Sequence, residues 1–247
     1  MPKPKEINNL KKKTQMKLFF TLLIVAIAAI ILSTSKTFTN LISFKFHQND
    51  FINSIAKHQL LAILVATIVV VLITKLNPDN KHFLNIGNLN VIAEKEKWLG
   101  INGKSTWKTN GLQLLFFVSI PTAIFMFLAL KYTNSLNNFQ LYFIPLIILF
   151  ALINSLTEEL IFRFGIVGGL YTHSPKLMIL IISAILFGLP HYFGWPSGFA
   201  GIFMAGMLGY ILCKATIETK GISIAWTIHF VQDVIIFTAL FMMNIKK

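Results

Sequence analysis

Apolar residues in this chain are gathered into long, nearly uninterrupted runs separated by short polar segments. Seven such runs can be counted, at about residues 18–34, 59–76, 111–130, 142–171, 177–192, 198–213 and 222–243. Most of them approach the roughly 20 residues that an α-helix needs to cross a hydrocarbon core of ~30 Å. The pattern predicts an all-α fold, a polytopic transmembrane helix bundle with about seven membrane helices and a range of six to eight.

The polar segments indicate how the chain is organised. The basic N-terminal stretch and the first apolar run resemble a signal peptide, but no small-x-small cleavage pattern follows, which favours an uncleaved membrane helix. Residues 77–110 form the one long polar connection, and we expect its Trp98 and Trp107 at the level of the lipid headgroups. We therefore divide the chain into N-terminal membrane helices, 1–140, and a C-terminal helical core, 141–247.

The lysines predict which side of the membrane each polar segment faces. Six lysines precede residue 18 and five lie in the 77–110 connection. The loops on the opposite side hold four: Lys36, Lys45, Lys57 and Lys131. Because positive residues favour the inner side, the N-terminus is expected in the cytoplasm. Seven helices would leave the C-terminus outside, and Lys246 and Lys247 argue mildly against that.

Composition narrows the class of protein. Of the residues, 55% are hydrophobic and 13% charged, which is about half the usual charged fraction of a globular protein. The net charge of +13 comes from lysines between the apolar runs, so anionic headgroups explain it better than a nucleic-acid partner. The single cysteine, Cys213, excludes an intrachain disulfide. A chain rich in Lys and Asn and poor in Arg is typical of AT-rich bacterial genomes, which suggests a bacterial cell membrane.

A few charged residues lie inside the apolar runs, where charge is costly. Glu158, Glu159 and Asp233 do so, and the only arginine of the chain is Arg163, four residues after Glu159. This spacing puts Glu159 and Arg163 on one helix face, where a guanidinium can hold a carboxylate with two hydrogen bonds. The alternative is a helix that ends near residue 156 and leaves these charges in water. The apolar pattern resumes at once, which favours a continuing helix.

Counting residues from the turn at 172–176 places these groups at similar depths. Glu158 lies 15 residues before His173 and His191 lies 15 residues after Lys176, so both are roughly 22 Å from that membrane face. On the last helix, His229 and Asp233 are one turn apart and about 12 to 18 Å from the same face. A shared polar cavity would satisfy all of these groups at once.

Neighbouring residues are expected to support this cavity. Phe187, one turn before His191, is by default a packing residue. Pro190 disfavours helical geometry at Leu189, so a kink or local opening is expected beside the histidine. The other four histidines are expected to be solvated in loops: His47, His58, His82 and His173.

Three motifs in separate apolar runs carry a family resemblance. EELIFR at 158–163 fits E-E-x-x-x-R, FGLPH at 187–191 fits F-x-x-x-H, and HFVQD at 229–233 fits H-x-x-x-N/D. Together, and in this order, they resemble the CPBP family of intramembrane proteases, also called Abi, which comprises type II CAAX prenyl endopeptidases and bacteriocin-processing proteins. The resemblance covers about residues 142–243, and the first 110 residues carry no signature of the family.

The resemblance implies an intramembrane endopeptidase. Glu158 and His191 would activate a water molecule, and His229 and Asp233 would stabilise the oxyanion. Glu159 and Arg163 would form a structural ion pair. Two positions depart from the family pattern. Asp233 replaces a common asparagine, which puts its oxyanion role in doubt. Phe164 stands where glycine is common.

Several alternatives stay open at this point. No cofactor is favoured, because a buried carboxylate is a stronger base, but Glu158, His191 and His229 could also hold zinc. A proton-coupled transporter or a non-catalytic immunity or scaffold protein would also use buried charges. The expected partner is a membrane-associated peptide or protein in the lipid bilayer, such as a CAAX protein, a leader peptide, a pheromone or a bacteriocin precursor. The oligomeric state is open.

Overall fold

The computed structural model describes residues 4–45, 47–194 and 196–245, and these residues form helices and loops without a named strand. Lys3, Lys246 and Lys247, used in the sidedness argument, lie outside the described residues. Seven helical segments of the described chain are long and apolar enough to cross a membrane. They are formed by α1 (Pro4–Ser33), α3 (Asp50–Leu76), α4 (Trp107–Tyr132), α5 (Ile144–Glu158) continued by the π-helix η5 (Glu159–Gly168), α6 (Lys176–Gly188), α7 (Gly198–Thr219) and α8 (Ser223–Asn244).

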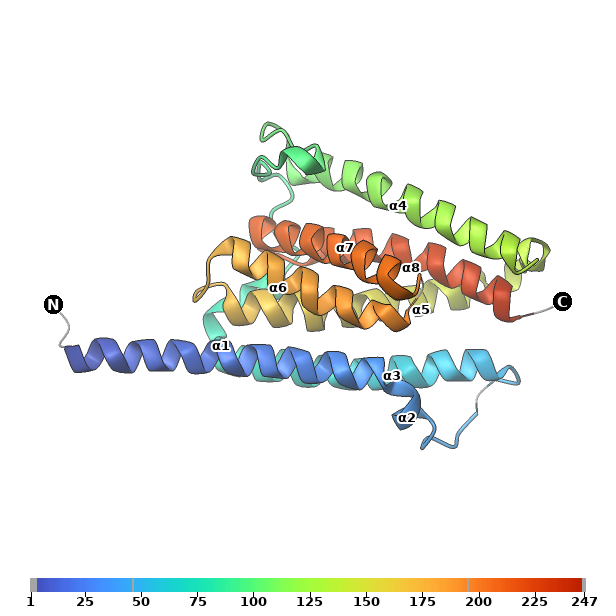
Figure 1. Ribbon diagram of the computed structural model, residues 1–247, viewed down its shortest axis with the longest axis horizontal. Coiled ribbons are helices and arrows are strands. Elements are labelled where there is room, and N and C mark those ends of the chain that lie inside the picture. Colours follow the sequence, from blue (N-terminus) through green and yellow to red (C-terminus); the bar gives the residue numbers. More distant parts are fainter. Residues whose placement is uncertain (1–3, 46, 195, 246–247) are drawn as a thin grey trace.

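The long helices run side by side, so the expected all-α polytopic bundle is confirmed (Figure 1). In this view α1 and α3 lie along one side of the bundle, α4 lies along the other, and α5 to α8 lie between them. Helix α1 begins and helix α8 ends at opposite ends of the bundle, as an odd number of spans requires (Figure 1). The outer helices expose large apolar side chains that a bilayer would cover, such as Leu64 of α3 and Phe116 of α4.

The N-terminal helices pack directly on the C-terminal ones. Val25 of α1 and Val69 of α3 belong to the same apolar cluster as Phe164 and Ile166 of η5 and Phe187 of α6. Gly165 allows the close approach, because a Cβ there would lie 3.0 Å from a methyl group of Val25. Helices α1 and α3 therefore support the helix that carries Glu159 and Arg163.

The connection between α3 and α4 folds over one end of the bundle. It contains the short helices η1 (Pro78–Leu84) and η2 (Lys97–Leu99). Its contacts converge on the buried carboxylate of Glu218, which accepts hydrogen bonds from the Glu94 backbone N–H at 2.9 Å and from Trp107 Nε1 at 2.8 Å. Lys176 and Lys214 donate to the same carboxylate at 2.6 and 2.7 Å.

This arrangement corrects one expectation about the connection. Trp107 is fully buried and bonded to Glu218, so it does not lie against headgroups, whereas Trp98 is half exposed. The N-terminal helix meets the same end of the bundle, because Lys17 Nζ donates to Asn77 Oδ1 at 3.1 Å. The two lysine-rich segments thus share one face of the bundle.

The helix carrying the acidic motif does not end near residue 156. It continues as η5, in which Glu159 and Arg163 are fully buried, so the alternative with solvated charges is wrong. A break does occur beside Pro190, as expected: α6 ends at Gly188 and His191 lies in the 3-10 turn η6 (Leu189–Phe193). His58 is not in a loop but in α3, with its Nδ1 2.9 Å from Ser35 Oγ.

The remaining short helices connect the long ones. Helix α2 (Ser35–Thr39) follows α1, and the 3-10 turns η3 (Leu136–Asn138) and η4 (Leu141–Phe143) join α4 to α5.

Candidate functional site

A cavity of about 320 Å³ lies among α4, α5, α7, α8 and the turn η6. Four of its polar lining residues were singled out in the sequence, and most of the rest of its wall is apolar. The polar lining residues are Thr122, Asn154, Glu158, His191, His229, Gln232 and Asp233. The four residues expected to be catalytic therefore face one space, although they come from α5, η6 and α8.

The second glutamate anchors the histidine of the last motif. Glu159 Oε1 lies 2.8 Å from His229 Nδ1, and Glu159 Oε2 lies 3.1 Å from Arg163 Nε. The Glu159 and Arg163 side chains are fully buried. Because a carboxylate only accepts, the Nδ1 of His229 carries a hydrogen and its Nε2 faces the cavity residues. Glu159 thus contacts both Arg163 and His229, and its contact with Nδ1 fixes the orientation of the His229 ring.

The arginine contact differs from the expected bidentate fork. Arg163 reaches Glu159 through Nε, while its Nη1 donates to Ser183 Oγ at 3.3 Å. Its guanidinium carbon lies 4.1 Å above the centre of the Phe187 ring, which is close enough for a cation–π contact. The guanidinium of Arg163, which lies on the π-helix η5, therefore contacts three partners: Glu159, Ser183 and the Phe187 ring.

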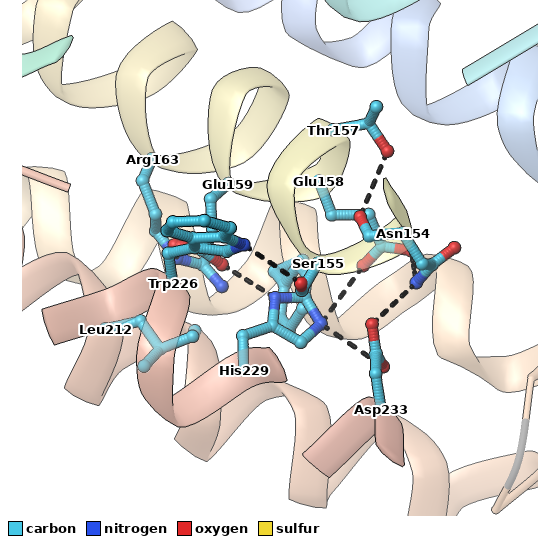
Figure 2. A network of polar contacts seen from close by, with 12 residues as sticks. Asn154, Ser155, Thr157, Glu158, Glu159, Arg163, Leu212, Trp226, His229 and Asp233 are labelled. Atoms are coloured by element: carbon cyan, nitrogen blue, oxygen red, sulfur yellow. Dashed lines mark hydrogen bonds and ion pairs between the residues drawn. The ribbon is translucent and has the colours of Figure 1, made fainter. Parts of the chain in front are cut away.

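Around the cavity, Glu158 and Asp233 approach the free side of His229. Glu158 Oε2 and Asp233 Oδ1 each lie 3.7 Å from His229 Nε2, beyond a direct hydrogen bond. Figure 2 shows Asn154 between the two carboxylates, with its Nδ2 donating to Glu158 Oε1 and to Asp233 Oδ2, both at 3.1 Å. Glu158 Oε2 is buried and has no hydrogen-bond partner among the described residues.

The histidine of the second motif is oriented by the end of the preceding helix, α6. His191 Nδ1 lies 2.7 Å from the Phe187 carbonyl oxygen, which can only accept, so this nitrogen carries the hydrogen. In the neutral ring the lone pair then resides on Nε2. The Phe187 ring contacts both imidazoles, with centres 4.7 Å from His191 and 5.5 Å from His229. Phe187 is thus a packing residue, as expected, but one that touches both histidines.

Sequence reasoning missed several residues of this network. Asn154 was not singled out, although a polar residue one turn before Glu158 in an apolar run was a usable signal. Gln59 of α3 donates to Asn154 Oδ1 at 3.2 Å, and Trp226 of α8 donates to Ser155 Oγ at 3.1 Å. Ser183, the partner of Arg163, also escaped notice. Nothing local to these sequences indicates such long-range partners.

The histidines and carboxylates of the cavity can also be compared with the arrangement that a metal ion needs. Among the residues that the structure describes, no group of three His, Cys, Asp or Glu side chains is arranged to hold one. His229 Nδ1 is engaged by Glu159 and His191 Nδ1 faces a carbonyl oxygen. These contacts leave Nε2 of each ring as the nitrogen that could bind a zinc ion together with Glu158.

Fold and site together define an integral membrane protein with a buried cluster of glutamate, histidine and aspartate lining a largely apolar cavity. Residues 140–235 match the model of the family "Type II CAAX prenyl endopeptidase Rce1-like". The match confirms the resemblance carried by the three motifs: this part of the chain is similar to that family of CAAX-type proteases. No curated protein and no solved structure matches the chain.

Proposed function

We propose that the protein is an intramembrane endopeptidase that hydrolyses a peptide bond with a water molecule activated by Glu158 and His191. The observation that carries the proposal is the buried Glu158 Oε2, which lacks a hydrogen-bond partner among the described residues and lies on the same cavity as His191, His229 and Asp233. A carboxylate oxygen without a hydrogen bond inside a membrane protein is costly, and a substrate or water would satisfy it.

In the proposed reaction, the water oxygen attacks the scissile carbonyl carbon while Glu158 accepts a proton from the water. His191 Nε2, left with a lone pair by the bond of Nδ1 to Phe187, holds the second water hydrogen. The carbonyl π electrons move to its oxygen and form the oxyanion. When the carbon–nitrogen bond breaks, the proton on Glu158 passes to the leaving nitrogen, so Glu158 returns to its starting state.

The oxyanion would be stabilised by His229 in its protonated form, in which both ring nitrogens carry a hydrogen and Nε2–H points toward the space between Glu158 and Asp233. The three carboxylates around the ring favour this charged form. Glu159 supports this role by holding the opposite nitrogen of the ring. Asp233 accepts hydrogen bonds when ionised and cannot donate one to the oxyanion. We therefore assign Asp233 to the orientation of His229, one turn earlier on α8, and not to direct stabilisation.

The cavity wall supports a membrane-associated peptide or protein as the substrate. Phe117, Pro121, Phe203, Met204 and Leu208 contribute apolar surface, and Phe117 and Phe203 are more than half exposed on the bundle surface. A substrate segment in the bilayer would meet this surface first. The lysine-rich face of the bundle supports a cytoplasmic N-terminus, and the composition supports a bacterial cell membrane.

The proposal is tested by comparing peptides released from cell membranes that contain the wild-type protein or Glu158→Gln. Glu94→Gln is a matched control, because Glu94 is an exposed glutamate outside the cavity. We expect a set of peptides that the wild type and Glu94→Gln release and Glu158→Gln does not. Identical peptides from all three proteins, at equal amounts of protein in the membrane, would overturn the proposal and favour a binding or transport function.

A further inference from the structure

A hydrogen-bond chain reaches the candidate site from a helix outside the segment that matches the family. Gln59 of α3 is 3% exposed and its Nε2 donates to Asn154 Oδ1 at 3.2 Å. Asn154 Nδ2 in turn donates to Glu158 and to Asp233 (Figure 2). Since the matched segment is 140–235, Gln59 links the N-terminal helices to the glutamate at the centre of the site.

The partners of Asn154 fix the direction of its amide. Ionised carboxylates only accept hydrogen bonds, so the nitrogen of Asn154 must face Glu158 and Asp233. The oxygen of Asn154 then faces Gln59, which presents its own nitrogen. A reversed Asn154 amide would set an oxygen against two carboxylates and a nitrogen against a nitrogen.

The side-chain nitrogen of Asn154 also reduces the repulsion between the carboxylates of Glu158 and Asp233. Glu158 and Asp233 accept from one nitrogen atom at 3.1 Å each, so the two accepting oxygens can be no more than twice that distance apart. Two carboxylates this close repel each other when both are ionised, and burial strengthens the repulsion. An amide placed between them offers a hydrogen to each.

We propose that Asn154, oriented by Gln59, is a positioning residue that holds Glu158 and Asp233 as a pair and supplies the amide that the third motif lacks. An asparagine at 233 could donate to Glu158 through its own amide, whereas Asp233 cannot. In this chain the amide comes instead from the helix of Glu158 itself, one turn earlier. This inference rests on the function proposed above.

The test measures the initial rate at which the protein releases the Glu158-dependent peptides from cell membranes, at increasing membrane concentration. Asn154→Ala should lower the saturating rate about 10- to 100-fold, the loss expected for a hydrogen bond to a charged group, without a comparable change in half-saturation. Asn154→Asp, although closer in shape, should be no more active than Asn154→Ala, because it adds a third carboxylate. Gln59→Leu should give a smaller loss of the same kind.

The decisive variant restores an amide at the other end of the pair. Asp233→Asn combined with Asn154→Ala should recover at least about tenfold in rate over Asn154→Ala alone, a non-additivity that a purely structural role would not produce. Asn110→Ala is the matched control, because Asn110 is also buried in a helix but bonds only to the backbone near the start of α4. It should release peptides at the wild-type rate.

The outcomes separate this inference from the proposed function. If Glu158→Gln abolishes peptide release while Asn154→Ala and Gln59→Leu release at the wild-type rate, the inference is wrong and the proposed function stands. Failure of Asp233→Asn to rescue Asn154→Ala also overturns it. If the release of no peptide depends on Glu158, both this inference and the proposed function are wrong. Should Asn154→Ala not accumulate in membranes, Gln59→Leu, which keeps Asn154, decides the question.

Discussion

Arg163→Met is expected to destabilise the protein strongly, because Arg163 neutralises a glutamate that no solvent reaches. The Glu159 and Arg163 side chains are fully buried in η5. After the substitution, Glu159 would keep His229 as its remaining charged or polar contact. Methionine fills similar volume, so the loss reports mainly on the missing charge.

The expected size follows from the burial of the pair. Removing one partner of a buried ion pair typically costs about 3–5 kcal/mol, because the other charge stays unpaired. The contact of the guanidinium with the Phe187 ring adds about 0.5–2 kcal/mol. For a chain of this length each kcal/mol lowers the melting temperature by about 2–4 °C, so a decrease of roughly 6 to 20 °C is expected from the ion pair.

The assay is thermal unfolding of the purified protein in one detergent, with the wild type and three variants. Glu159→Gln/Arg163→Met, which removes both charges, should be more stable than Arg163→Met alone. Lys45→Met is the control, because its ion pair with Asp50 is exposed, and it should melt close to the wild type. A wild-type melting temperature for Arg163→Met, or a double variant less stable than the single one, would refute the reasoning.

Three further predictions concern the loop, the helix packing and the cofactor. Glu218→Ala should leave Lys214, which is 2% exposed, without its closest carboxylate. It should also release the connection between α3 and α4 from the end of the bundle. A protease added to the protein should therefore cut within 85–106 much faster than in the wild type. Gly188→Ala should lower the melting temperature by the cost of overpacking, about 1–3 kcal/mol, because the new Cβ would lie 2.8 Å from the Ile202 carbonyl oxygen of α7. Incubation with 1,10-phenanthroline should leave peptide release unchanged, and a complete loss that zinc restores would contradict the expectation that the reaction needs no metal ion.

Much of the helical framework could be predicted from the sequence, for a physical reason. Length and apolarity of a segment are local properties, and the hydrocarbon core imposes nearly the same requirement on every span. The charges inside the spans were equally informative: because Glu159, Arg163 and His229 are costly in lipid, they had to meet, and they do.

The local geometry of the site could not be predicted in the same way. The sequence of 159–168 favours a continuing helix, but nothing in it indicates the π-helix that these residues form. The bidentate Arg163 contact expected from the four-residue spacing was wrong, because Arg163 meets Glu159 through Nε and directs Nη1 to Ser183.

Contacts between polar residues far apart in the sequence could not be predicted either. Gln59 and Asn154 are 95 residues apart, and nothing near either residue indicates the other. Trp107 looked like an interfacial tryptophan, because the glutamate that buries it, Glu218, lies 111 residues away. Such pairs are fixed by the assembled bundle and not by the local pattern.

The central claim, that Glu158 activates water for direct attack, is tested most directly by a single turnover in water labelled with oxygen-18. Excess enzyme is mixed with the uncleaved precursor of one of the Glu158-dependent peptides, and the new carboxyl group is analysed by mass spectrometry. The account predicts one labelled oxygen in that carboxyl group, none in Glu158, and no product from Glu158→Gln. An unlabelled product with label in Glu158, which marks a covalent attack by the carboxylate, would contradict it.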